Sequence, residues 1–175
     1  MEYKLNSSQL REYAPLLKAG DRVILSGTVY TARDAAHKRI AAAIENGEKL
    51  PFELKNAAIY YAGPTPAPQG LAVGACGPTT SGRMDVFTPL LLDNGLAAMI
   101  GKGERSEKVC ESIKKNKAVY LCAIGGAGAL ASKCIKECSV IAYDDLGCES
   151  VKKLRFEDFP LTVAVDCSGG NIFSR

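Results

Sequence analysis

The sequence lacks the signals of a secreted, membrane-bound or nucleic-acid-binding protein. The first nine residues are polar and contain no apolar segment of the kind found in signal peptides. No stretch approaches the roughly 20 apolar residues of a membrane span. No run of five or more like charges occurs and the net charge is only +3, which argues against a nucleic acid partner. We therefore expect a cytoplasmic protein with no membrane and no nucleic acid partner.

The cysteines lack the spacing of a metal or redox motif. There are seven, an odd number, and no two of them form a C-x-x-C pair. In a cytoplasmic protein we expect them to be reduced thiols. Cys134 and Cys138 are separated by three residues, but one such pair supplies too few ligands for a metal. Iron–sulfur motifs need three or four thiolates at tighter spacing, so we predict no metal held by this chain.

A length of 175 residues is sufficient for one domain with a sizeable core. Short apolar runs alternate with segments of helical period, which predicts a single α/β domain with a mixed sheet over residues 1–175. Expected strands are 22–30, 57–62, 71–76, 97–100, 118–124, 139–143 and 161–165. Expected helices begin near Ser7, at a Thr31–Asp34 capping box, after 77–85 with a kink or restart at Pro89, at Ser106, and after 125–128.

The first candidate site loop follows the strand expected at 22–30 and contains Arg33 and His37. A cation in the first turn of a helix is unfavourable for the helix alone, because the dipole end there is positive. Arg33 in that place makes sense if an anion binds to it, or it is a surface arginine paired with a nearby acid. His37 shares its helix face. A lone histidine is usually packed and hydrogen-bonded, so His37 is the weaker candidate.

The second candidate loop carries consecutive hydroxyls, Thr79, Thr80 and Ser81, between glycines and before Arg83. One hydroxyl could serve as a helix N-cap, but a single cap does not explain all of them. The hydroxyls, the guanidinium and the helix start offer donors to a carboxylate. We therefore predict an anion site here.

The third candidate loop is Gly101-Lys102-Gly103, where flanking glycines would let a ligand approach the backbone. By itself this tripeptide is a weak signal, because a solvated lysine in a turn is the commoner case. Together, Arg33, Arg83 and Lys102 place three cations after three separate strands. This arrangement suits a small dianion such as a dicarboxylate. No complete nucleophile triad accompanies them.

A different motif favours a dinucleotide site. The run from Gly126 to Ala131 fits G-x-G-x-x-A after an expected strand, and Asp144 and Asp145 follow the next strand. Too few residues follow to complete a second mononucleotide-binding half. The glycines also have an ordinary use in a tight strand-to-helix turn.

The motifs together resemble the β subunit, or C-terminal domain, of class I iron–sulfur fumarases and the related L-tartrate dehydratases. They occur in the family's order across nearly the whole chain, and the long motifs around Arg33 and Thr79 are the most specific. The carrying motifs are Gly27-Thr-Val-Tyr-Thr-Ala-Arg-Asp-Ala-Ala-His-Lys38, Tyr61-Ala-Gly-Pro64, Gly77-Pro-Thr-Thr-Ser-Gly-Arg-Met-Asp85, Gly101-Lys-Gly103, Gly125-Gly-Ala-Gly128 and Val165-Asp-Cys-Ser-Gly-Gly-Asn-Ile172.

The resemblance implies a swivelling β/β/α domain and a cytoplasmic hydro-lyase that interconverts fumarate and L-malate. It implies that Thr79 acts as the base, that Arg33, Arg83 and Lys102 hold the substrate carboxylates, and that Thr80 adds a hydrogen bond. It also implies a hetero-oligomer, because the cysteines that hold the [4Fe–4S] cluster belong to a separate α subunit or N-terminal domain. An iron of that cluster acts as a Lewis acid.

Three alternatives stay open at the level of sequence. The substrate can be tartrate or another hydroxy-diacid in place of fumarate. The chain can be a dinucleotide-binding domain that uses Gly126 and Gly128. It can also be a non-catalytic assembly subunit.

Overall fold

All strands in the described part of the chain belong to one mixed sheet. The computed structural model describes residues 1–123 and 128–174. Neighbouring strands from β1 to β5 run parallel, and β7 runs antiparallel to β5 and β6. The strands are β1 (Glu2–Asn6), β2 (Arg22–Thr31), β3 (Ala58–Tyr60), β4 (Ala98–Gly101), β5 (Val119–Cys122), β6 (Ile135–Ala142) and β7 (Val151–Val165). The predicted α/β class with a mixed sheet is confirmed.

The long strand β7 closes the sheet on itself. It pairs antiparallel with β2 along one edge and with β5 and β6 along the other. Because β2 is joined to β5 through β3 and β4, the strands enclose an apolar interior. Val29, Tyr60, Ile100 and Phe156 lie in this interior and are almost fully buried. Such closure leaves few unpaired strand edges.

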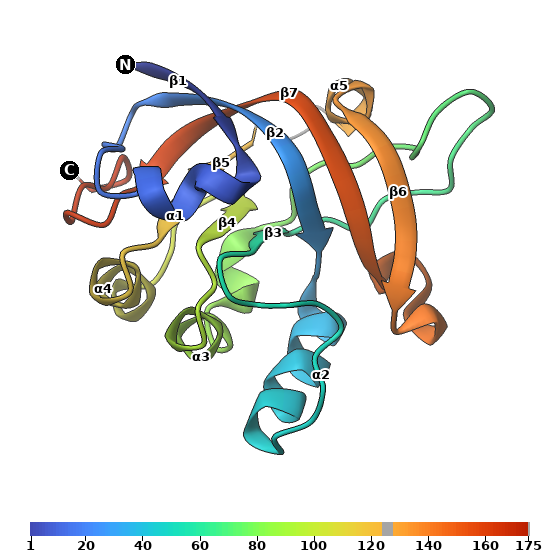
Figure 1. Cartoon of the computed structure of the whole chain (residues 1–175), viewed down its shortest axis with the longest axis horizontal. Coiled ribbons are helices and arrows are strands. Elements are labelled where there is room, and N and C mark those ends of the chain that lie inside the picture. The colour runs from blue at the N-terminus through green and yellow to red at the C-terminus, as the bar shows by residue number, and fades with distance from the viewer. Residues whose placement is uncertain (124–127, 175) are drawn as a thin grey trace.

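Helices cover the other face of the central strands, on one side of the sheet in Figure 1. They are α2 (Asp34–Glu45), α3 (Thr88–Asp93) and α4 (Glu107–Lys115). Successive residues of a strand point to opposite faces. Tyr60 therefore packs inside the closed sheet, whereas Tyr61 packs with Ile40 and Leu92 under the helices.

Local sequence signals explain several helix ends. Asn6 caps the 3-10 helix η1 (Ser7–Gln9), its side chain accepting from the N–H of Ser8 while the Gln9 side chain accepts from the N–H of Asn6. α1 (Leu10–Tyr13) follows. Pro89 lies in the first turn of α3, so the predicted restart is confirmed. In the described part of the chain, no helix is both long and apolar enough to cross a membrane.

Some predicted elements differ from the structure. Residues 71–76 form no strand; instead this segment bonds to an adjacent loop, where the Thr65 hydroxyl accepts from the N–H of Ala75. β1 was not predicted, although Tyr3 and Leu5 alternate with Glu2 and Lys4 as expected for a strand, so this signal was missed. β7 begins well before the predicted 161–165, and its early part lies between β2 and β6. These elements depend on partners that are distant in sequence.

Candidate active site

The candidate site lies at the carboxyl ends of the parallel strands β2, β3 and β4, which lie together along one side of the sheet and are here called the sheet edge. Arg33 follows the end of β2, and Lys102 follows β4 directly. Carboxyl ends of neighbouring parallel strands meet at the same edge, which is where α/β proteins build sites. The loops with Arg33 and Lys102 therefore begin at the same edge, as their positions after strands predicted.

The segment with Thr79 returns to this edge through backbone hydrogen bonds. The N–H of Thr79 donates to the carbonyl of Tyr61, which follows β3, over 2.6 Å. Thr80 forms a parallel bridge with Lys102, and the N–H of Ser81 donates to the Lys102 carbonyl over 2.9 Å. Thr79 and Thr80 are thereby fixed next to Lys102. Thr79 is half-buried and Thr80 is exposed.

Gly101 has a different role from the one expected. A Cβ at this position would lie 2.0 Å from Ser81 Oγ and 2.8 Å from Cδ2 of Tyr61. The glycine therefore makes room for Ser81 and not for a ligand. The Tyr120 hydroxyl lies 2.8 Å from Ser81 Oγ and 2.8 Å from the Gly103 carbonyl, so it links the two loops.

Arg83 is joined to the loop that carries Arg33. It lies in the short 3-10 helix η2 (Ser81–Met84) and is about half exposed. Its Nε and Nη2 lie 3.0 and 2.7 Å from the same carboxylate oxygen of Asp34, the residue after Arg33. The structure thus brings the second candidate loop against the first.

Arg33 is the N-cap residue of α2 and not a residue of its first turn. The predicted capping box is wrong, because Thr31 is a buried residue of β2. Its hydroxyl accepts from the backbone N–H of Lys152, 3.1 Å away. The Nε of Arg33 lies 3.9 Å from Oε1 of Glu149, an acid that sequence reasoning missed. Its role could not be read from the sequence, since it lies far along the chain.

His37 is packed under the sheet edge, with 1% of its surface exposed. Its Nδ1 lies 2.9 Å from the carbonyl of Arg33, so Nδ1 carries the hydrogen. Burial and the nearby charge of Arg105 lower its pKa to about 4. His37 is therefore neutral at pH 7 and holds the backbone of Arg33. The packed interpretation fits it better than a role as a base.

Arg105 is a second residue that the sequence did not reveal. Its side chain is fully buried, with Nε 2.7 Å from Asp85 and Nη2 2.9 Å from the Thr88 hydroxyl. The guanidinium also lies over the rings of Tyr61 and Tyr120. It thereby connects the segment after Arg83 to the strands that hold Thr79 and Ser81.

Buried polar atoms without a partner gather at this site. Within residues 1–123 and 128–174, the buried side-chain atoms without a hydrogen-bond partner are Nε of Arg33, Oδ1 of Asp34, Nε2 of His37 and Oε1 of Glu149. Such atoms are rare in folded proteins and call for an explanation. All belong to the N-terminal end of α2 or to the residue that faces it. Of these atoms, only Nε of Arg33 is a donor and the other three are acceptors, so the start of α2 holds polar groups that are not fully satisfied.

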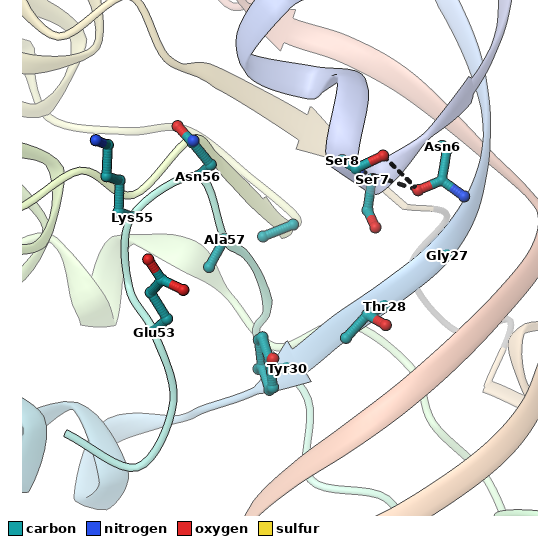
Figure 2. Close-up of a pocket in the computed structure, with 11 residues that line it drawn as sticks. Asn6, Ser7, Ser8, Gly27, Thr28, Tyr30, Glu53, Lys55, Asn56 and Ala57 are labelled. Atoms are coloured by element: carbon teal, nitrogen blue, oxygen red, sulfur yellow. Dashed lines mark hydrogen bonds between the residues drawn. The ribbon is translucent and has the colours of Figure 1, made fainter.

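A polar cavity of about 330 Å³ lies elsewhere, beside β2 and the beginning of β3 (Figure 2). Asn6, Thr28, Glu53 and Lys55 are among its lining residues. A Cβ at Gly27 would come within 2.6 Å of the side chains of Asn6 and Ser7, so a glycine is needed in this wall. None of the predicted site residues lines this cavity.

Metal ligands do not converge in the described part of the chain. Among those residues, no group of three or more His, Cys, Asp and Glu side chains is arranged to hold a metal ion. Cys134 directly precedes β6 and Cys138 lies in its middle, and both are only half-buried. The described residues therefore do not fit an iron–sulfur cluster held by this chain.

The dinucleotide motif receives little support from the structure. Gly126 and Ala127 lie outside the described residues. α5 (Gly128–Lys133) is short, and the strand that follows it, β6, pairs antiparallel with β7. Asp145 contacts both Nη atoms of Arg39 through its two oxygens. Asp145 is therefore paired with Arg39, whereas in a dinucleotide site this acid would accept a hydrogen bond from the ribose of the cofactor.

Comparison with protein families decides which group this chain is part of. The model of the family described as Fumarase C-terminus matches residues 1–175. The chain belongs to this family. The resemblance inferred from the motifs is thus confirmed.

Relatives of this Fumarase C-terminus chain fall into two kinds by length. Fumarate hydratase 2 of Leishmania major is 40% identical over 177 residues, which cover 100% of this chain and 31% of the relative. The aerobic class I fumarate hydratase of Escherichia coli K12 is 40% identical over 170 residues, covering 96% of this chain and 30% of the relative. The putative L(+)-tartrate dehydratase subunit beta of Methanocaldococcus jannaschii is 37% identical over 181 residues, covering 100% of this chain and 92% of the relative. The chain therefore spans about a third of these fumarate hydratases and nearly all of that β subunit.

Proposed function

We propose that this chain is the β-type part of an iron–sulfur hydro-lyase that adds water to fumarate to give L-malate and catalyses the reverse reaction. Residues 1–175 form its single domain, and the complex acts in the cytoplasm. Membership of the Fumarase C-terminus family supports the reaction class. Two long relatives that carry the name fumarate hydratase support the substrate.

The cations of the site form the clamp for a dicarboxylate. Arg33 precedes α2 and faces Glu149, and Arg83 pairs with Asp34 at the start of α2. Lys102 lies beside Thr80 on the same sheet edge. Each arginine can offer two parallel N–H groups to a carboxylate, and the lysine adds a compact charge. These charges would also stabilise the negative charge that builds on the substrate as C3 loses its proton.

Thr79 is the residue that takes or returns the C3 proton. Its backbone is fixed by the short bond to the Tyr61 carbonyl, so its position at the sheet edge is well defined. A free threonine hydroxyl is a weak base at neutral pH. It requires nearby cations and an acidic group from the partner to become active. Thr80 adds a hydrogen bond to the substrate, and His37 holds the Arg33 backbone.

The [4Fe–4S] cluster is held by a separate α subunit, with which this chain forms a hetero-oligomer. Two observations support this division. The described residues do not converge on a metal, and a relative named as a β subunit matches the chain over nearly its whole length. A complete active site then needs both chains.

The same relative supports a second substrate. It is named a putative L(+)-tartrate dehydratase subunit. Tartrate is also a hydroxy-dicarboxylate, so the same clamp could hold it. Tartrate differs from malate by one additional hydroxyl, which lies on the carbon that loses its proton. Contacts from the partner would distinguish the two substrates.

The observation that carries the proposal is that the Arg83–Asp34 pair and the Thr80–Lys102 bridge join the three cation-bearing loops beside Thr79, in a chain of this family. The test is anaerobic reconstitution with an α-type chain that carries the cluster cysteines, followed by assays on fumarate, malate and tartrate. Turnover of fumarate and malate supports the proposal, and turnover of tartrate alone favours the second substrate. Tight binding of NAD or FAD to the isolated chain, measured by calorimetry, would contradict both.

A further inference from the structure

The turn between β6 and β7 packs against α2 through two arginine–acid pairs. The turn is the 3-10 helix η3 (Asp144–Glu149). Near the middle of α2, Nη1 of Arg39 lies 2.9 Å from Asp145. At the start of α2, Arg33 lies beside Glu149. The first pair is exposed, whereas both members of the second are about three-quarters buried.

Arg33 lies in a narrow space between Gly63 and this turn. A Cβ at Gly63 would come within 3.1 Å of Nη1 of Arg33, 3.2 Å of its Cδ and 3.2 Å of the Cys148 carbonyl. A side chain at this position would press on Arg33 and on the turn. The guanidinium is therefore confined on one side by the backbone of Gly63 and faces the residues around Cys148.

Lys152 stabilises the end of this turn through hydrogen bonds of its side chain. Its ammonium group donates to Ser150 Oγ at 2.8 Å and to the carbonyls of Cys148 and Ser150 at 3.0 and 3.2 Å. The residue is 8% exposed. Its backbone N–H bonds to Thr31, two residues before Arg33. The turn and the strand that leads to Arg33 are thus held together by one buried lysine.

We propose that Glu149 is a positioning residue that holds the Nε side of Arg33 and so aims its two terminal nitrogens at the substrate carboxylate. This inference rests on the proposed function. The separation of 3.9 Å is too long for a hydrogen bond, and neither atom has another partner in the described part of the chain. The pair is an ion pair that tightens when a carboxylate arrives, as catalytic contacts often do.

Arg83 shows the same arrangement with a different acid. Its Nε and Nη2 face Asp34, which leaves the terminal side of the guanidinium open. Two arginines from separate loops are thus each held by one protein carboxylate at the Nε side. An arginine held in this way loses less freedom when it binds a ligand, which favours binding.

The test compares Glu149→Gln with Asp145→Asn in the reconstituted complex. Both substitutions remove one acid that pairs η3 with α2, so Asp145→Asn controls for a loosened contact between the turn and the helix, and the split between KM and kcat separates positioning of Arg33 from a general loss of structure. We expect Glu149→Gln to raise the KM for fumarate about tenfold, the scale of one lost charged contact, and to change kcat by less than about twofold. Asp145→Asn should leave both constants unchanged. Equal KM values for Glu149→Gln and the unmodified complex would overturn the inference.

A second readout does not depend on catalysis. In the isolated chain, the carboxylate of Glu149 should slow exchange of the Arg33 Nε–H with water through its negative charge, which repels hydroxide, since at 3.9 Å the two groups form no hydrogen bond. The Nε–H signal of Arg33 in ¹⁵N NMR should therefore exchange faster in Glu149→Gln and stay unchanged in Asp145→Asn. An unchanged Arg33 signal in Glu149→Gln would also overturn the inference. If the unmodified complex fails to hydrate fumarate, the proposed function is contradicted, whereas this signal still decides whether Glu149 positions Arg33.

Discussion

The backbone N–H of Thr79 donates to the carbonyl oxygen of Tyr61 over 2.6 Å. The Tyr61 hydroxyl in turn accepts from Arg105, 3.2 Å away, and its ring lies under the same guanidinium. Thr79 is thus attached to a residue that is fixed by a buried cation. The proposed base is held by its main chain, which leaves its hydroxyl available for chemistry.

Replacing Thr79 with alanine should abolish turnover in the reconstituted complex, because it removes the proposed base and leaves the backbone bond intact. Thr79→Ser keeps a hydroxyl and should retain measurable turnover. Activity on malate, with the cluster spectrum as a check on integrity, measures both. Near-normal activity of Thr79→Ala would refute the assignment of the base.

Arg83→Met should weaken dicarboxylate binding, because it removes one of the proposed clamp cations. We expect the KM for malate to rise about 10- to 100-fold, the effect of losing a charged hydrogen-bonded contact. Arg155→Met is the matched control, since Arg155 is a similarly exposed arginine paired with acids on β6 and β7. An equal effect of the two substitutions would show that Arg83 does not contact the substrate.

The imidazole of His37 should titrate near pH 4 in the folded protein, because burial and the charge of Arg105 disfavour its protonated form. The chain has a single histidine, so its ring signals in NMR report on this residue alone. A measured pKa close to the ordinary value of about 6.5 would mean that the ring is open to water.

This lowered pKa also predicts a pH dependence of stability. Between about pH 6.5 and 4 the unfolded chain binds a proton at His37 that the folded chain does not, so the contribution of His37 to stability falls as the pH falls. Because the pKa of His37 falls from 6.5 to about 4, the loss in the free energy of unfolding should approach about 3 kcal/mol at pH 4. Urea unfolding of the protein and of His37→Gln over this range measures it. Equal pH slopes for the two proteins would contradict the prediction.

Arg105→Met should destabilise the fold by about 3–5 kcal/mol, because it leaves the nearly buried carboxylate of Asp85 without its partner. Arg105→Lys keeps the charge but loses the fork geometry, so its effect should be smaller. Denaturant unfolding gives both values. A loss below about 1 kcal/mol for Arg105→Met would indicate that water reaches Asp85.

Gly101→Ala should displace the segment of Thr79, because the added Cβ would overlap Ser81 Oγ and the Tyr61 ring. We expect a loss of about 1–3 kcal/mol in the free energy of unfolding, typical of overpacking. Gly82→Ala is the control, since its Cβ would meet only the Glu104 carbonyl at 3.8 Å. Similar losses for the two variants would argue against a tight contact at Gly101.

The sequence by itself determined the fold class, the elements with strong periodicity and the family. Segments such as α4, with Ser106 as its cap, and α3, with Pro89 in its first turn, follow from local rules of capping and backbone geometry. Arg33 and Lys102 were chosen as candidates because they follow apolar strands. Such signals are local, so they can be read without a partner.

Only the tertiary structure decided what the charged side chains contact. The pairs Arg33–Glu149 and Arg83–Asp34, and the burial of Arg105, join residues that are far apart in the sequence. β7 could not be predicted in full, because its first half is stabilised by β2 and β6 and not by its own pattern. A residue's type sets what it can bind, but its partners depend on how the chain brings distant strands together.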